Sequence, residues 1–334
     1  MRGSIRWLVL FVVGCGGAGA SAAKPSPPTP SASPASSTAP AASTAPAASS
    51  AALPPSVTSG QKLTLADARR YMVTLVNRDR ASEGLPPVEL DEGAPSRAGD
   101  RHARDMAKNG FLGHFGTDGS IPEQRLTEAG GADMVMENAF CVVDEKPREI
   151  DPDPRIDPKD LERAEDMFFH ETPPNDGHRK NILNRFHTRL GVGLALPKPS
   201  GNEILVPCLT HEFVDGYGTY AAIPKTLAVG QKLHVAGTFG PGVTPGGVGF
   251  ARLDDPKALP VAEANRRRVI TQRAADVIYW PKGFVSPVPL ALDGRNFSID
   301  FAFPKPGFYE VSVWAKYPGQ KDYASISLRT IAVQ

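Results

Sequence analysis

The chain has 334 residues, of which 41% are hydrophobic and 22% are charged, an ordinary composition for a globular protein. Its 37 lysines and arginines nearly balance its 36 aspartates and glutamates, so the formal net charge is +1. This balance excludes the strong positive field that steers proteins to nucleic acid, and we expect no nucleic-acid partner.

The N-terminus has the pattern of an export signal. Arg2 and Arg6 precede the apolar run 7–13, which is too short to span a bilayer and is typical of a secretory signal. The run leads into Val-Val-Gly-Cys, which resembles the bacterial lipobox and makes Cys15 the predicted site of lipid attachment. Ordinary signal cleavage within residues 18–23 is the alternative.

We therefore predict a lipoprotein signal region at residues 1–23, followed by a disordered tether at residues 24–60. The segment 24–56 consists almost entirely of proline, alanine, serine and threonine, and it repeats the hexapeptide Ser-Thr-Ala-Pro-Ala-Ala. Such a segment cannot bury a core, and at about 3 Å per residue it reaches ~100 Å when extended. This predicts an exported protein, anchored by its lipid in a membrane and facing the periplasm or the cell exterior.

Two cysteines, Cys141 and Cys208, lie in the globular part of the chain. An exported protein meets oxidising conditions, so we predict a disulfide between them. Two separate buried thiols are the alternative.

The globular part is predicted to begin with two amphipathic helices. Thr64 and Asp67 have the spacing of a capping box, and apolar residues recur at helical spacing until Gly84. A second helix is predicted from near Ser96 to Asn109-Gly110. It carries His102 on its apolar face, where we expect a hydrogen-bonded packing residue rather than a ligand.

Residues 111–138 are glycine-rich and irregular, and we predict a loop there. A helix from near Pro158 is predicted to end at Glu171, because Pro173-Pro174 cannot continue it. The segment 177–183 predicts a further short helix or turn.

Two strand-like runs, residues 190–196 and 204–213, follow and predict a hairpin. Beyond Pro224 the chain becomes strand-rich, with alternating or apolar runs separated by glycine and proline turns. The predicted strands are residues 232–238, 297–303, 309–315 and 326–333. This predicts a β-sandwich at residues 225–334, which would present or dock the preceding domain.

Several phrases between residues 62 and 217 resemble the CAP superfamily, named for cysteine-rich secretory proteins, antigen 5 and pathogenesis-related proteins. The phrases are Asn77 with Arg80, His102-Ala103, His114 with Asp118-Gly119, Glu137-Asn138, Gly177-His178-Arg179 and Gly191-Val192-Gly193. The resemblance implies an α-β-α sandwich with a cleft, which we place at residues 61–221. The predicted fold class is thus α+β, a CAP-like sandwich followed by a smaller all-β, immunoglobulin-like domain.

The same resemblance implies that the cleft holds two histidines and two acids. His114, Glu137 and His178 match the family positions directly. Glu171 is our choice for the second acid over its rival Glu165, because it lies nearer His178 along the chain. Phe168 stands where the related phrase has tryptophan, which is a departure from the family pattern.

Two chemical hypotheses remain open for these four side chains. Imidazole nitrogens and carboxylate oxygens suit Zn²⁺ or another divalent cation, so all four are candidate metal ligands. Alternatively, the carboxylates hydrogen-bond the imidazoles, raise their pKa values and form a network without an ion.

We expect the domain to bind a lipid, glycan or protein of the cell envelope, as the resemblance implies for some members. The sequence establishes no catalytic activity. The alternative is a hydrolase, a protease or a glycan hydrolase, that uses Glu137 and Glu171 as its catalytic carboxylates.

Overall fold

The computed structural model describes residues 60–199, 205–270 and 272–334. The predicted signal, the lipidation site Cys15 and the tether lie outside these residues, as does part of the predicted hairpin turn. Within the described ranges, none of the helices has the length and apolar character needed to cross a membrane.

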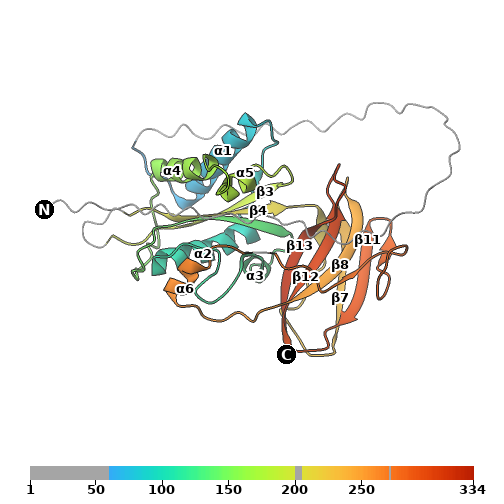
Figure 1. Ribbon diagram of the computed structural model, residues 1–334. Helices are drawn as coiled ribbons and strands as arrows, with labels where there is room; N and C mark the ends of the chain where they lie inside the picture. The colour runs from blue at the N-terminus through green and yellow to red at the C-terminus, as the bar shows by residue number, and fades with distance from the viewer. Residues whose placement is uncertain (1–59, 200–204, 271) are drawn as a thin grey trace, which may run out of the picture.

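The first domain is a four-stranded sheet between two layers of helices (Figure 1). The strands are β1 (Glu89–Leu90), β2 (Met134–Phe140), β3 (Arg189–Ala195) and β4 (Cys208–Asp215), in the order β1-β3-β4-β2. One face is covered by α1 (Leu65–Ser82), α4 (Pro158–Phe169) and α5 (Gly177–Ile182), and the other by α2 (Ala94–Asn109) and α3 (Pro122–Glu128). The order places β2 at one edge of the sheet.

Local sequence accounts for the helix ends. The Thr64 hydroxyl accepts a hydrogen bond from the Asp67 N–H, which caps α1 as predicted. The α2 helix ends at Gly110, whose φ of 67° is the left-handed conformation typical of a C-terminal glycine. Two glycines of β3 let α2 pack close to the sheet, because a Cβ on Gly193 would lie 2.1 Å from the Gly99 carbonyl carbon.

The segment 111–138 is more regular than we predicted. It contains α3 and most of β2, so Glu137 lies on a strand and not in a loop. The short helix begins with Pro122, which suits a first helical position, and its interior is buried against the neighbouring domain. Tertiary packing thus determines the secondary structure of this segment, whose local sequence signals are weak.

The second domain is all-β and consists of two sheets packed on one core. Its sheets have the orders β10-β11-β7-β5 and β6-β13-β12-β8-β9. The strands are β5 (Gly218–Tyr220), β6 (Thr226–Leu227), β7 (Lys232–Phe239), β8 (Thr244–Leu253), β9 (Val277–Tyr279), β10 (Ala291–Asp293), β11 (Asn296–Ala302), β12 (Gly307–Lys316) and β13 (Ala324–Val333). The fold class predicted from the sequence, an α+β domain followed by an all-β domain, is confirmed.

The boundary between the domains lies earlier than the predicted residues 221–225, because β5 pairs with β7 of the sandwich. The connection between β8 and β9 also leaves the sandwich and returns to the first domain. We call residues 254–276 the arm; it contains α6 (Val261–Arg266), which lies beside α2 in Figure 1. Ala264 of α6 packs in one apolar cluster with Met106 and Phe111.

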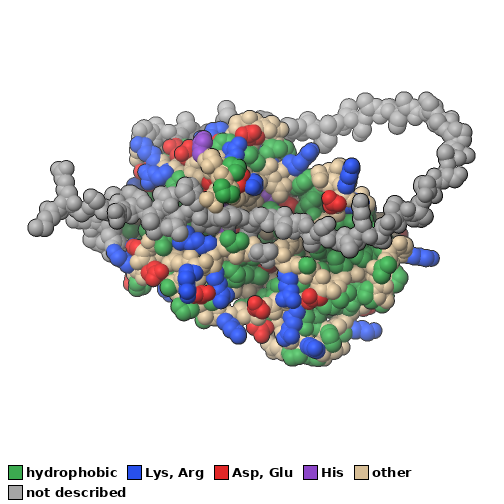
Figure 2. Space-filling view, viewed as in Figure 1, with side chains coloured by type: hydrophobic (Ala, Val, Ile, Leu, Met, Phe, Trp, Pro, Cys, Tyr) green, Lys and Arg blue, Asp and Glu red, His purple; other side chains and the backbone are tan. Residues whose placement is uncertain are grey.

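Cys141 and Cys208 form the predicted disulfide, with their Cα atoms 4.3 Å apart. Cys141 directly follows β2 and Cys208 begins β4, so the bond ties the edge strand to its neighbour. On the face shown in Figure 2, acidic and basic side chains are interspersed over both domains, as expected from the balanced composition.

Candidate functional site

His114 lies on the loop between α2 and α3, and its ring is held by Glu137 of β2. The Nδ1 atom is 2.9 Å from Glu137 Oε1, and both side chains are buried. An ionised carboxylate only accepts, so Nδ1 carries the proton and donates it. In the neutral form of this tautomer, the lone pair lies on Nε2.

His178 and Glu171 form a second pair of the same kind. His178 Nδ1 lies 2.6 Å from Glu171 Oε1, and the backbone N–H of His178 donates to Glu171 Oε2 at 2.8 Å. Phe168 packs against the imidazole, with ring centroids 4.5 Å apart. Phe168, which stands where the family pattern has tryptophan, thus covers one face of the His178 ring.

The two pairs come from opposite helical layers and meet at the edge strand β2. Glu137 points to the α2 and α3 side, whereas its neighbour Asn138 points to the α5 side and donates to the His178 carbonyl oxygen at 3.3 Å. Burial is the main cause that lowers the pKa of His178, and the neighbouring His114 adds a smaller effect in the same direction. The structure therefore brings all four predicted side chains into one region.

Arg125 of α3 completes the environment of Glu137. Its guanidinium donates to Glu137 Oε2 at 2.7 Å and to the carbonyl oxygens of His114 and Ser120. Burial opposes ionisation of Glu137, but Arg125 and the two nearby histidines outweigh it and hold the pKa of Glu137 below its usual range. The carboxylate is thus kept ionised beside His114.

Glu212 of β4 lies directly opposite Glu137 in the β2–β4 ladder. Burial and the neighbouring carboxylate raise the pKa of Glu212 well above its usual range. Glu212 therefore holds its proton to a higher pH than an ordinary glutamate, because the two carboxyls occupy one buried region.

Glu165, the rival acid, does not contact His178. It is fully buried, and its Oε2 lies 3.8 Å from His211 Nε2. Burial and the nearby Asp79 raise the pKa of Glu165 well above its usual range, and burial lowers the pKa of His211 to about 3. This pair is a second buried acid–histidine contact behind Phe168.

His102 is the packing residue that its apolar neighbours predicted. Its Nε2–H donates to the Gly113 carbonyl oxygen at 2.7 Å, directly before His114. Burial lowers the pKa of His102 to about 4, so the ring is neutral at physiological pH. It supports the backbone of the His114 loop.

The rings of His114 and His178 are enclosed by protein, with 0% and 3% of their surfaces exposed. Their Nε2 atoms are buried and make no hydrogen bond with any residue that the structure describes. Burial also lowers the pKa of His178, so the predicted rise by its carboxylate is outweighed. Two buried imidazoles thus keep Nε2 atoms that no described side chain hydrogen-bonds.

The four side chains do not form a four-ligand shell in this arrangement. Both oxygens of Glu137 and both of Glu171 already bind protein donors. Across the described ranges, no group of three or more histidine, cysteine, aspartate or glutamate side chains is arranged to hold a metal ion. A cation here would be held by the two Nε2 atoms, with the carboxylates orienting the rings.

Sequence reasoning missed the contributions of Arg125, Glu212 and His211. All three are polar residues on faces that the fold buries. The alternation along β4 places Glu212 and His211 on opposite faces, but only the β2–β4 register shows that Glu212 meets Glu137.

The fold and the paired histidines define an α-β-α sandwich domain with an acid-supported two-histidine site. The model of the cysteine-rich secretory protein family, CAP, matches residues 73–206, which include all four predicted side chains. The chain therefore carries a CAP domain at these residues.

Two solved structures are similar to parts of the chain. An extracellular protein containing an SCP domain from Bacillus anthracis str. Ames has 21% identity and a TM-score of 0.33, over 46% of this chain and 44% of that one. The chain thus spans less than half the length of that protein. Superoxide reductase (neelaredoxin) from Ignicoccus hospitalis has 10% identity and a TM-score of 0.20, over 35% of this chain and 80% of that one. No curated protein matches the chain.

Proposed function

We propose that this is an exported CAP-domain protein in which His114 and His178 bind a divalent cation. The observation that supports the cation is the pair of buried Nε2 atoms, which have no hydrogen-bond partner in the described part of the chain. Leaving a buried polar atom unpaired costs about 1–3 kcal/mol, so a ligand that satisfies both nitrogens is favoured. A carboxylate behind each imidazole is the usual arrangement at metal sites.

The enclosure of the rings supports a small ligand. Only an ion or a molecule of similar size reaches imidazoles this buried without displacing Phe168 and its neighbours. A bound cation would supply Lewis acidity, while Glu137 and Glu171 hold the rings in orientation. An envelope lipid, glycan or protein would then be recognised on the surface around this centre.

Export is supported by the basic and apolar N-terminal pattern and by the Cys141–Cys208 disulfide, a bond typical of oxidising compartments. Membrane anchoring through Cys15 remains part of the proposal. The hydrolase alternative is less well supported, because both oxygens of Glu137 and both of Glu171 already accept hydrogen bonds from protein donors.

Calorimetric titration of the chelator-stripped protein with ZnCl₂ tests the cation site. We expect binding near one equivalent, and His114→Ala and His178→Ala should each weaken it at least tenfold. His234→Ala is the matched control, because His234 is an exposed histidine of the β-sandwich. No heat with the unchanged protein, or equal heat with His114→Ala, would refute the cation.

A second measurement separates binding from catalysis. The protein is incubated with envelope lipids and cell-wall fragments, and bound material and products are analysed separately. The proposal expects retention without turnover. Products that disappear in Glu137→Gln would instead establish the hydrolase.

A further inference from the structure

The β-sandwich domain makes two separate connections to the histidine site, one to each histidine. One connection is a chain of buried hydrogen bonds that begins at Tyr317, directly after β12, and ends at His178. The other is the arm, residues 254–276, which contacts both ends of the loop that carries His114. The two connections share no residue.

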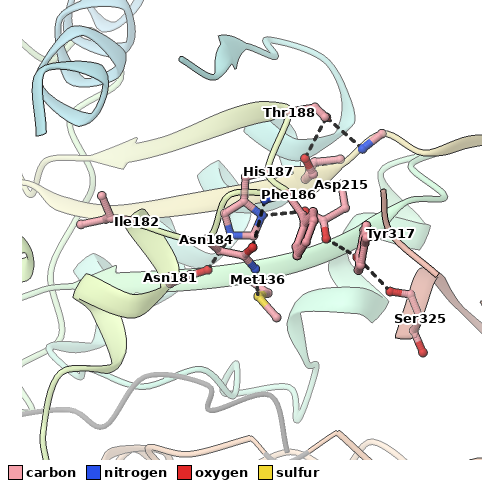
Figure 3. Close-up of polar contacts among 12 residues, drawn as sticks. Met136, Asn181, Ile182, Asn184, Phe186, His187, Thr188, Asp215, Tyr317 and Ser325 are labelled. Atoms are coloured by element: carbon pink, nitrogen blue, oxygen red, sulfur yellow. Dashed lines mark hydrogen bonds and ion pairs between the residues drawn. The ribbon is translucent and has the colours of Figure 1, made fainter. Parts of the chain in front are cut away.

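The first connection crosses the domain boundary at Asp215, the last residue of β4. The Tyr317 hydroxyl donates to Asp215 Oδ2, and Asp215 Oδ1 lies 2.6 Å from His187 Nδ1 (Figure 3). Phe186 stacks on Tyr317 with ring centroids 4.3 Å apart and an interplanar angle of 14°. The ring of Tyr317 is thus fixed by both a hydrogen bond and an aromatic contact with the first domain.

From His187 the chain of hydrogen bonds continues to His178. His187 Nε2 lies 2.9 Å from Asn181 Oδ1, Asn181 donates to Asn138 Oδ1 at 2.8 Å, and Asn138 donates to the His178 carbonyl oxygen. Every side chain along this path is less than 9% exposed. Because each member is satisfied by the next, displacing one leaves a buried polar group without a partner.

The second connection is made by the arm. Asn265 of α6 accepts a hydrogen bond from the Leu112 N–H at 3.0 Å and donates to Glu145 at 2.9 Å. At the other end of the loop, the Leu259 N–H donates to the Thr117 carbonyl oxygen at 2.7 Å. His114 lies between these two attachment points.

The loop is shaped to receive the arm. A Cβ on Gly113 would lie 2.8 Å from the Ala264 carbonyl oxygen, and one on Gly119 would lie 2.3 Å from the Lys257 carbonyl oxygen. Backbone thus packs on backbone at both positions. The position of the loop therefore depends on a segment that belongs, by sequence, to the other domain.

We propose that the β-sandwich is a positioning domain for the histidine site, in which Tyr317 sets the His178 segment and Asn265 sets the His114 loop. This rests on the proposed function only in taking these two histidines as the site. Docking of the sandwich then fixes the distance between the two imidazoles, because the segments that carry both rings contact the same domain.

The test is a crossed comparison of histidine ring resonances in the whole protein without added metal. The chain has seven histidines, which single substitutions assign one by one. Tyr317→Phe removes one oxygen and should shift the His187 and His178 resonances while leaving His114 unchanged. Asn265→Ala should shift His114 while leaving His178 unchanged.

Two control variants change side chains close to Tyr317 and Asn265 in sequence that take no part in the two connections. Tyr309→Phe deletes a part-buried tyrosine hydroxyl on β12, which donates to the Lys305 carbonyl oxygen within the sandwich. Glu263→Gln alters α6 at a side chain that pairs with arginines of the arm. Neither control should shift His114 or His178.

A second variant keeps the test decisive if Tyr317→Phe fails to fold. Asp215→Asn has the same size as the original residue and removes the charge that His187 and Tyr317 share, so it should also shift His178. The proposal is overturned if His178 is unchanged in both variants, or if Tyr309→Phe shifts it equally. These resonances are read without zinc, so failure of the cation site leaves the result interpretable.

Discussion

At the residue scale, the site depends on a buried ion pair as much as on its histidines. Arg125 is 1% exposed and joins Glu137 to two backbone carbonyls of the His114 loop. An arginine suits this position because its planar guanidinium presents several donors at once. The orientation of His114 thus follows from a side chain that does not touch its ring.

We predict that Arg125→Met destabilises the protein by about 3–5 kcal/mol, because it leaves the Glu137 charge buried without its main partner. Arg101→Met is the control: Arg101 is about 40% exposed and pairs with Asp118 and Glu128 at the surface. Such surface pairs contribute about 1 kcal/mol or less. Urea unfolding measures both, and equal losses would contradict the importance of the buried pair.

At the element scale, the contact between the arm and the His114 loop requires glycine at one position for two reasons. Gly119 has a φ of +83° and also lies against the Lys257 backbone. Gly130 has a φ of +90° but has no atom within 4 Å of an added Cβ. Comparing substitutions at the two glycines thus distinguishes the cost of a left-handed backbone from the cost of a clash with the arm.

Gly130→Ala should cost about 1–2 kcal/mol through left-handed strain alone. Gly119→Ala should cost more and should also displace the arm from the loop. Limited trypsin digestion reports the displacement, because the arm contains Arg266, Arg267 and Arg268. Equal digestion rates for the two variants would show that Lys257 does not hold the loop.

At the scale of the whole molecule, the outer face of the larger sandwich sheet packs on the first domain. The Thr330 N–H donates to the Thr127 hydroxyl at 3.1 Å, and Ser327 donates to the Ala132 carbonyl oxygen. This interface buries two carboxyls, Glu310 of β12 and Glu123 of α3. Burial first, and the nearby Glu123 second, raise the pKa of Glu310 to about 8.

Because the pKa of Glu310 is raised, the stability of the folded protein depends on pH. Between the ordinary glutamate value of 4.5 and about 8, the unfolded chain releases the Glu310 proton while the folded protein retains it, so stability falls as pH rises. The groups that face Glu310 are Glu123 from α3, Thr330 from β13 and Ala251 from β8. Burial also raises the pKa of Glu123, so it adds to the effect in the same direction.

We predict that Glu310→Gln gains stability relative to the unchanged protein as pH rises from 5 to 8, by at most about 1.4 kcal/mol per pH unit. Chemical unfolding across this range measures the difference. Glu89→Gln, at an exposed position of β1, should give a curve parallel to that of the unchanged protein. A parallel curve for Glu310→Gln would mean that Glu310 titrates normally.

Much of the fold was predictable because its signals are local. The Thr64 cap, the stop at Gly110 and the proline pair after α4 fix helix ends within a few residues, and the four longest apolar runs of the C-terminal region appear as strands. The ten-residue strand β8, the short strands β5, β6, β9 and β10 and the helix α6 were missed. They are stabilised by the partners they pair with or pack on, and their own sequences carry little signal.

The sequence by itself determined which histidines and acids are candidates, since His114, Glu137, Glu171 and His178 each stand in a recognisable phrase. Only the tertiary structure decided their roles. It assigns each carboxylate to an imidazole Nδ1, places Arg125 and Glu212 around Glu137, and bonds Tyr317 to Asp215 and Asn265 to the loop of His114. These contacts join residues far apart in the chain, and their geometry depends on strand register and domain packing, which local sequence does not encode.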